Sequence, residues 1–389
     1  MGWQIDTDIP YGNACDIAVI DMQDHSEISF SAAPHGGLEA LWFCFRLQYT
    51  EGAPNQPLRL IMKNPQNTLA GPSVHRFRPV IRMNDDDWQR LAPGAPEDLP
   101  DGRRQVVWTI ESPATTIDIA FCYPYGMPEV DALIRDTDGY WKRDGIGVTS
   151  HGRPIVRLSN NYGAPDGDKS GLYLIARQHS GETPGSWVLD GFLRYLATHR
   201  DSAPLVWVIP FVNRDGVEAG DYGKDPYPID LNRAWQRPFR QSMRFEIQCI
   251  ERDIALWAGR CKPTLGMDFH APGGTENDGV YAYIPNSFYL RSGHFASKVW
   301  ADAIAESLDT HYRSPDFTRI TTPQNHFTRW GIPEKADRFG EYMWNEHTVP
   351  TVMPEIPYAL CAGDTLMTRE RYREVGMQMA AAVVTQIHR

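Results

Sequence analysis

The chain has 389 residues, of which 42% are hydrophobic and 22% charged. This composition is that of a folded protein with enough apolar side chains for one large core or two moderate ones, and it excludes a disordered chain, a collagen and a small disulfide scaffold. The 38 basic and 49 acidic residues give a net charge of -11, so there is no overall positive field that would hold nucleic acid or an anionic membrane.

The sequence shows no signal for a membrane or for export. No apolar run approaches the roughly 20 residues that a helix needs to cross a bilayer. The first residues, Met1 to Asp6, are not a basic segment followed by an apolar one. The six cysteines form no CxxC pair, and we expect them to be small buried side chains with free thiols. These observations predict a cytoplasmic protein without a membrane or nucleic-acid partner.

Residues 1–125 are predicted to form a β-sandwich domain of antiparallel strands. Short runs in which apolar and polar residues alternate are separated by Gly, Pro, Asn and Asp. In the run 41–49, Phe43 and Phe45 share one face, and the run 117–123 alternates in the same way. Antiparallel sheets with one face in water give this pattern.

Residues 126–389 are predicted to form an α/β domain with a mostly parallel central sheet covered by helices. Near-continuous apolar runs, typical of strands buried on both faces, alternate here with segments of helical period. The strand candidates are 172–176, 205–209, 264–267 and 351–353. The helix candidates are 187–196, 243–254, 299–308 and 372–383. Thr183 is the expected N-cap of the first helix, with Pro184 as its first residue.

A candidate metal-binding pair follows the first of these strands, in residues 176–182 (ARQHSGE). At the mouth of a parallel strand, His179 and Glu182 can reach the same ion. A second histidine, His270, ends another apolar run and would arrive at the same rim. Two histidines and one glutamate are a zinc-ligand set that leaves a position open for water. Taken alone, the HxxE pair is more typical of two solvated side chains and His270 of a hydrogen-bonded loop histidine, so the interpretation depends on all three.

Three further groups of polar residues are candidates for the same site. Asp230 and Asp268 could orient the ligand histidines by binding the imidazole nitrogen that does not face the metal, or they could cap turns. Asn232 beside Arg233 offers an amide and a planar guanidinium, which together suit a carboxylate, although such a pair also occurs on surfaces. Glu355 ends an otherwise apolar strand, where an acid needs either a salt-bridge partner or a function.

In their order along the chain, the segments HSGE, DLNR and DFH and the late strand glutamate resemble the zinc metallocarboxypeptidase family, over about residues 130–385. The runs 41–46 (LWFCFR) and 121–125 (FCYPY) are similar to segments of the β-sandwich that precedes the catalytic domain in its cytosolic carboxypeptidase subfamily. Residues 177–187 are close to the zinc motif of that subfamily.

The resemblance implies an enzyme that hydrolyses the C-terminal amide bond of peptides or of protein tails, with one Zn²⁺ ion as cofactor. Zinc would activate a water molecule, and Glu355 would act as general base and pass the proton to the departing amine. Asn232 and Arg233 would bind the free α-carboxylate. The implied zinc ligands are His179, Glu182 and His270.

One position departs from the family. An arginine that steadies the oxyanion usually lies about nine residues before the motif asparagine, and Gly223 stands there in this chain. Lys224 could replace it as a point charge without the bidentate fork. Alternatively, an arginine from another part of the chain takes this role. If no residue does, the enzyme is slow or altered, because losing one such donor costs about a hundredfold to a thousandfold in turnover.

Other functions and details stay open at this point. The altered stretch at Gly223 is also compatible with a zinc amidase or deacylase acting on a small or cell-wall-derived substrate, or with a catalytically weakened binding protein. The segment 324–355 is expected to line the pocket for the terminal side chain. Arg329, Lys335 and Arg338 in it would favour an acidic residue, unless they are solvated loop charges. The sandwich could support the catalytic domain, narrow its cleft or mediate assembly into a homo-oligomer.

Overall fold

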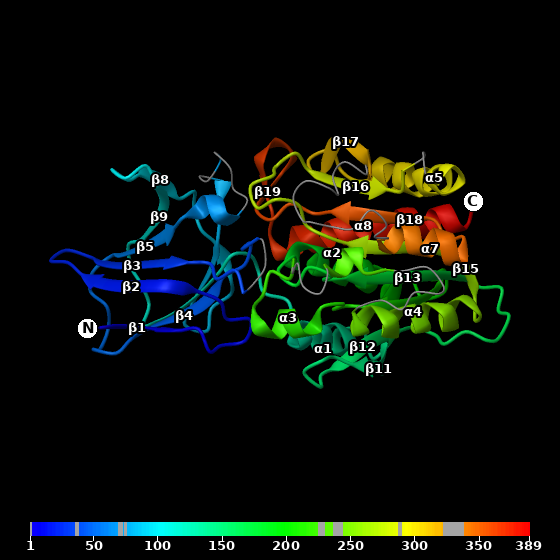
Figure 1. The fold of residues 1–389 in the computed structure, drawn as a ribbon, viewed down its shortest axis with the longest axis horizontal. Helices are drawn as coiled ribbons and strands as arrows, with labels where there is room; N and C mark the ends of the chain where they lie inside the picture. Colours follow the sequence, from blue (N-terminus) through cyan, green and yellow to red (C-terminus); the bar gives the residue numbers. More distant parts are fainter. Residues whose placement is uncertain are drawn as a thin grey trace.

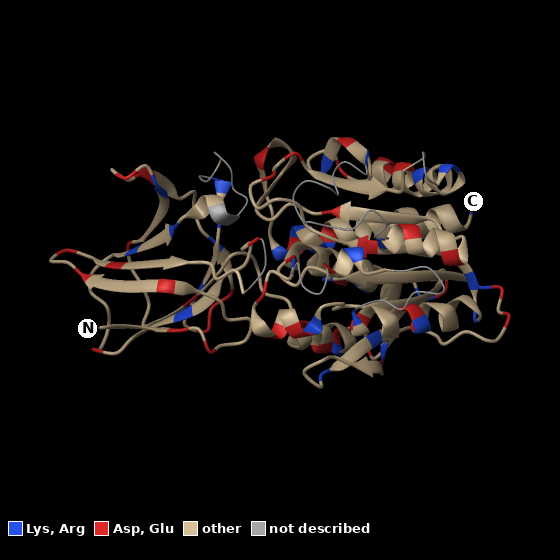
Figure 2. Ribbon diagram, viewed as in Figure 1, with Lys and Arg blue, Asp and Glu red and all other residues tan. Residues whose placement is uncertain are grey.

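The computed structural model describes residues 2–35, 39–68, 73, 76–224, 230–235, 244–286, 290–321 and 338–389. The N-terminal strands lie at one end of an elongated molecule, and a large sheet with its helices forms the other end (Figure 1). Lys and Arg alternate with Asp and Glu over both ends (Figure 2), so the net negative charge is not concentrated on one element. Among the described helices, none has the length and apolar character that a membrane span requires.

Two five-stranded sheets make up the N-terminal part. The order in the first is β1 (Trp3–Asp6), β4 (Cys44–Tyr49), β10 (Thr116–Ala120), β6 (Val80–Met83) and β7 (Gln89–Arg90). The order in the second is β2 (Cys15–Asp21), β3 (Ser26–Ser31), β5 (Leu58–Lys63), β9 (Arg104–Ile110) and β8 (Ala95–Asp98). The antiparallel arrangement is as predicted, except that β3 and β5 are parallel. They are parallel because the chain between them crosses to the other sheet to form β4.

The faces of these strands follow the alternation in the sequence. Phe43 and Phe45 are buried and contact the ring of Phe30, at 5.0 and 4.8 Å between centroids. Asp118 lies on the face predicted to be wet, yet it is buried. Its carboxylate accepts hydrogen bonds from Arg46 Nε at 2.6 Å and from Arg82 Nη2 at 2.5 Å. Two guanidinium groups thus compensate one carboxylate.

The C-terminal part is built on one eight-stranded sheet. Its order is β11 (Lys142–Val148), β12 (Pro154–Ser159), β14 (Leu205–Ile209), β13 (Ser170–Ala176), β15 (Lys262–Phe269), β18 (Thr351–Glu355), β16 (Val280–Ile284) and β17 (Arg313–Ile320). The pairs β13–β14, β13–β15, β15–β18 and β16–β17 are parallel. All four predicted strands are present, and the mostly parallel sheet covered by helices is confirmed.

Helices cover both faces of this sheet (Figure 1). Alternate side chains of β13 lie in two separate hydrophobic cores. Leu172 and Leu174 belong to the first core, and Tyr173 and Ile175 belong to the second. The first core also takes side chains from α1 (Met127–Asp136), α2 (Thr183–Thr198), α5 (Arg291–Ser307) and α8 (Arg369–Ile387). The second takes them from α4 (Phe245–Ala258) and α7 (Phe339–His347). Both faces of the strand are therefore apolar, as the continuous run predicted.

The local predictions were corrected in two places. The N-cap of α2 is Glu182, and Thr183 is already helical. Glu182 makes no capping hydrogen bond, because its carboxylate faces the histidines instead. The helix expected over 243–254 is α4 and begins at Phe245, while residue 243 lies outside the described residues. All six cysteines are free thiols, and only Cys15 is not buried.

The remaining short elements are α3 (Arg214–Ala219), β19 (Leu360–Cys361), β20 (Thr365–Leu366) and the 3-10 turns η1 (Pro65–Thr68), η3 (Leu231–Arg233) and η4 (Ala362–Asp364).

Candidate metal centre

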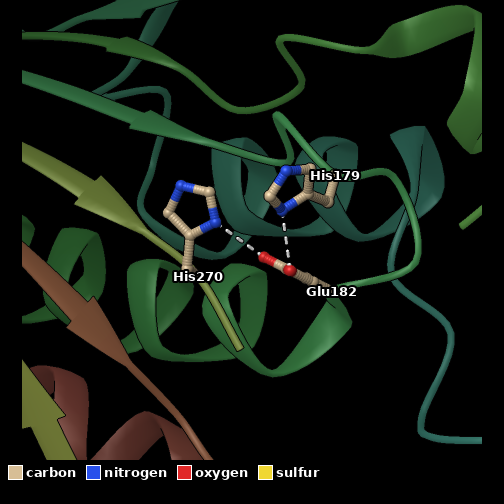
Figure 3. Close-up of side chains that lie close together, drawn as sticks. All are labelled: His179, Glu182 and His270. Atoms are coloured by element: carbon tan, nitrogen blue, oxygen red, sulfur yellow. Dashed lines mark hydrogen bonds and ion pairs between the residues drawn. The ribbon is translucent and has the colours of Figure 1, made fainter. Parts of the chain in front are cut away.

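The candidate ligands meet at the edge where β13 and β15 end. These strands are parallel and in register, with Ala176 opposite Phe269, so the residues that follow each strand emerge side by side. His179 and Glu182 lie in the turn from β13 into α2, and His270 directly follows β15. One ligand atom from each of the three lies within 4.8 Å of the other two. Figure 3 shows both imidazoles turned toward the carboxylate of Glu182.

The donor set fits a zinc ion. The Nδ1 atoms of His179 and His270 each lie 2.8 Å from an oxygen of Glu182, one on Oε1 and the other on Oε2. All three side chains are buried. Two imidazole nitrogens and a carboxylate that converge on one point are the protein ligands of zinc sites that keep an open position.

A carboxylate lies against the outer nitrogen of each imidazole. His179 Nε2 is 3.2 Å from Asp230 Oδ1, and His270 Nε2 is 2.9 Å from Asp268 Oδ2. Carboxylates in this position hold a metal-binding histidine in one tautomer and orientation, and they make the inner nitrogen a better ligand. The structure thus brings both aspartates to the histidines, and the orienting role remains a prediction.

Two buried residues that the sequence analysis missed complete this network. Gln178 Nε2 donates to Asp268 Oδ2 at 2.6 Å, and Gln178 Oε1 accepts from Trp235 Nε1 at 2.8 Å. Tyr222 donates its hydroxyl hydrogen to Glu182 Oε1 at 3.1 Å. The sequence signal for Gln178 was its place directly before His179, whereas Tyr222 comes from a separate loop that no local pattern connects to the ligands.

The charges of the centre stabilise one another. Burial opposes the charged form of His179, but the carboxylates of Glu182 and Asp230 outweigh this effect and raise its pKa. Burial would also raise the pKa of Glu182, yet the imidazoles of His179 and His270 hold it well below the usual range. A divalent ion would therefore compete with protons for the imidazoles, and its affinity should increase with pH.

Glu355 is placed beside His270 by the backbone. The two residues form a parallel β-bridge, and His270 N donates to Pro354 O at 2.9 Å. Within the described residues, the buried Glu355 Oε2 has no hydrogen-bond partner. Burial, opposed by His270 and reinforced by nearby carboxylates, raises the pKa of Glu355 to about 8. A buried carboxyl group whose pKa is raised in this way is suited to accept and return a proton near neutral pH.

Asn232 and Arg233 lie in η3, and Asn232 is close to His270. Asn232 Nδ2 is 3.5 Å from His270 Nε2, and Arg233 Nη1 donates to Asn232 O at 2.9 Å. Both are buried, and Arg233 Nε has no partner among the described residues. Burial and the neighbouring charge of Arg233 lower the pKa of Arg338 to about 10. Two guanidinium groups close to each other attract an anion.

Gly223 cannot carry the arginine that the family usually has at this position. Its φ is +88°, and a Cβ there would lie 2.4 Å from Ser180 Oγ and 2.6 Å from Ser180 N. Lys224 follows, and its Nζ is 3.0 Å from Glu39 Oε2 in the N-terminal part. Burial would raise the pKa of Asp230, but the imidazole of His179 lowers it, and the charges of Arg233 and Lys224 contribute in the same direction. Arg329 and Lys335 lie outside the described residues.

In its sheet and in the buried His, Glu, His set at the ends of the parallel strands, the chain is similar to metallocarboxypeptidase-type proteins. A family model described as zinc carboxypeptidase matches residues 130–253. The predicted resemblance to the zinc carboxypeptidases, and to their cytosolic carboxypeptidase branch, is confirmed by this match and by the relatives that follow.

Curated relatives include "Cytosolic carboxypeptidase 6" of Caenorhabditis elegans, 23% identical over 304 residues, which covers 72% of this chain and 65% of that protein. "Cytosolic carboxypeptidase 6" of Mus musculus is 25% identical over 220 residues, with 51% and 40% covered. The chain thus spans less than two thirds of the length of these relatives.

Solved structures confirm the fold. A metallo-carboxypeptidase from Burkholderia cenocepacia superposes with a TM-score of 0.76 at 19% identity, covering 100% of this chain and 99% of that one. A metallo-carboxypeptidase from Pseudomonas aeruginosa in complex with (2-guanidinoethylmercapto)succinic acid reaches a TM-score of 0.73 at 19% identity, with 99% of both chains covered.

Proposed function

We propose that this protein is a zinc-dependent metallocarboxypeptidase that hydrolyses the C-terminal amide bond of peptides or protein tails. The proposal is carried by one observation: His179, Glu182 and His270 converge in a buried cluster beside Glu355, whose Oε2 has no partner among the described residues. We further propose that residues 126–389 are the catalytic domain, residues 1–125 a separate β-sandwich domain, and the cytoplasm the place of action, in keeping with the names of the curated relatives.

Each group then has a defined part in the reaction. A zinc ion held by the three ligands would supply an activated water and polarise the scissile carbonyl. Glu355 would take the proton of the attacking water on its carboxylate and transfer it to the departing amine nitrogen. Arg233 and Asn232 would bind the terminal α-carboxylate through the guanidinium fork and the amide. Lys224 would place a positive charge near the oxygen that becomes negative.

We infer that the pocket for the terminal side chain prefers glutamate or aspartate. Arg338 lines a cavity together with Tyr283, Thr321 and Met353, and this cavity extends to Asp268 behind His270. The guanidinium is buried, and the neighbouring Arg233 adds a like charge that Glu341, also in the lining of this cavity, offsets in part. An acidic side chain would offset both the burial and the repulsion, whereas an apolar or basic one would not.

The test measures bound metal and the release of the last residue from short peptides. Wild type should bind one zinc ion per chain, and a chelator should abolish release until zinc is returned. The Glu355→Gln variant should keep its zinc and lose about a hundredfold to ten-thousandfold in turnover, the usual contribution of a general base. Undiminished release by this variant contradicts the mechanism.

A matched pair of substrates tests the carboxylate receptor. The same peptides with an amidated C-terminus should react far more slowly, because they lack the carboxylate for Arg233. Equal rates on both would contradict the carboxypeptidase and favour an amidase.

A further inference from the structure

Residues 220–224, here called the connecting segment, lie between the metal centre and the N-terminal sandwich. On one side the segment is tied to the turn that carries the zinc ligands. Ser180 Oγ donates to Asp221 O at 2.8 Å, and Gly181 N donates to Tyr222 O at 2.9 Å. A shift of this segment would therefore also shift the metal-binding turn.

On its other side the connecting segment is held by the sandwich. Asn13 Nδ2 donates to Gly220 O at 2.8 Å, and Asn13 Oδ1 accepts from Ala33 N at 2.8 Å. His35 Nδ1 forms a further contact with Asp221 Oδ1. Two side-chain contacts thus join residues of the first 35 positions to a loop more than 180 residues away, and the contact with Ala33 holds the Asn13 side chain in place within the sandwich.

The charged member of this interface is the pair Glu39 and Lys224. Glu39 Oε2 lies 3.0 Å from Lys224 Nζ, and the side chains are 2% and 16% exposed. A carboxylate buried to this extent needs a cation beside it. Lys224 in turn has a flexible four-carbon stem, so its ammonium stays in one place only if it is held. It lies 5.8 Å from the ring of Tyr222, whose hydroxyl contacts Glu182.

We propose that Glu39 is a positioning residue of the reaction: the N-terminal sandwich supplies a buried carboxylate that holds the Lys224 ammonium at the metal centre. This inference rests on the proposed hydrolase function. An ammonium has three donors, so it can bind Glu39 with one and still offer another to a carbonyl oxygen in the cleft. Lys224, held in place by Glu39, would thereby present a cation where Gly223 has no side chain to offer one.

Steady-state kinetics of Glu39→Gln, with a C-terminal peptide, tests this positioning role. Glutamine keeps the shape and a hydrogen bond to Lys224 but removes the charge. We expect kcat to fall roughly tenfold, the lower range for a hydrogen bond to a charged group, with KM nearly unchanged because the α-carboxylate receptor is intact. Glu39→Asp, which keeps the charge, should recover part of the loss.

A double-mutant cycle separates positioning from a merely structural role. If Glu39 acts through Lys224, then Glu39→Gln combined with Lys224→Ala should be no slower than Lys224→Ala alone. Glu27→Gln is the matched control, because Glu27 is a partly buried sandwich carboxylate paired with Arg59 within the sandwich. This control should leave kcat unchanged. Zinc content and melting temperature are measured for every variant.

The outcomes distinguish this inference from the proposed function. An inactive, zinc-loaded wild type overturns both. An active wild type with a fully active Glu39→Gln variant overturns only the role of Glu39. Additive losses in the cycle, or a fall in kcat that follows loss of zinc, show that Glu39 supports the fold alone, and this too overturns the positioning role.

Discussion

The N-terminal sandwich and the metal centre both bury carboxylates, but they compensate them differently. In the sandwich, Asp118 is matched by the two guanidinium groups of Arg46 and Arg82, so its charge is already balanced. In the metal centre, four carboxylates surround two imidazoles. These carboxylates belong to Glu182, Asp230, Asp268 and Glu355. The comparison teaches that the two buried regions differ in charge balance: guanidinium groups match the acid in the sandwich, whereas acids outnumber imidazoles in the metal centre and leave a place for a cation.

Removal of a ligand histidine should give the largest effect. His179→Ala removes one of the three proposed zinc ligands, and the two that remain do not form a complete zinc site. We expect loss of bound zinc and activity at background level, measured by elemental analysis and by peptide hydrolysis. A fully loaded and active variant would show that the cluster is not the metal site.

The free energy of unfolding of the metal-free protein should depend on pH because of Glu355. Burial raises the pKa of Glu355 from 4.5 to about 8. Between these pH values the folded, metal-free protein keeps a proton that the unfolded chain has lost, so stability falls as the pH rises. Relative to Glu355→Gln, metal-free wild type should lose on the order of a few kcal/mol between pH 4.5 and pH 8, since each pKa unit corresponds to about 1.4 kcal/mol. Denaturant unfolding of both proteins measures this difference, and parallel pH profiles would contradict it.

The two classes of buried aspartate should respond differently to the loss of charge. Asp268→Asn should weaken zinc binding by about 10-fold to 100-fold, because it replaces the charged carboxylate at His270 Nε2 with a neutral amide, which is a weaker acceptor. Asp118→Asn should leave zinc affinity unchanged and cost about 2 kcal/mol of folding free energy, because two guanidinium groups lose their negatively charged partner and keep one neutral acceptor oxygen. Metal titration and denaturant unfolding of both variants measure the contrast. An equal loss of zinc affinity in both would remove the distinction.

The smallest expected effect concerns the terminal side chain. Arg338→Gln should reduce kcat/KM for a peptide ending in glutamate by roughly tenfold, in line with the loss of one charge-assisted hydrogen bond. The rate on a peptide ending in phenylalanine should change little. Competition between the two peptides measures the ratio directly, and an unchanged ratio would exclude Arg338 from specificity.

Much of the architecture was readable from periodicity. The strand 172–176 is buried on both faces because it is a continuous apolar run. In the run 41–49, burial alternates only after Phe45, because Trp42 and Cys44 are buried as well as Phe43 and Phe45. The same patterns could not show that β3 and β5 are parallel, because the alternation within a strand does not indicate which strand it pairs with or in which direction. Nor could they show that Glu182 faces the histidines and that Thr183 is already helical.

The sequence by itself determined the elements, the order of the ligand motifs and the acid at the end of β18, because these depend on residues close together in the chain. Tertiary structure alone decided that Gln178 joins Trp235 to Asp268, that Ser180 leaves no room for a side chain at position 223, and that Glu39 meets Lys224 across 185 positions. The physical reason is that burial and charge compensation arise between segments brought together by folding, and no local pattern records which segments those are.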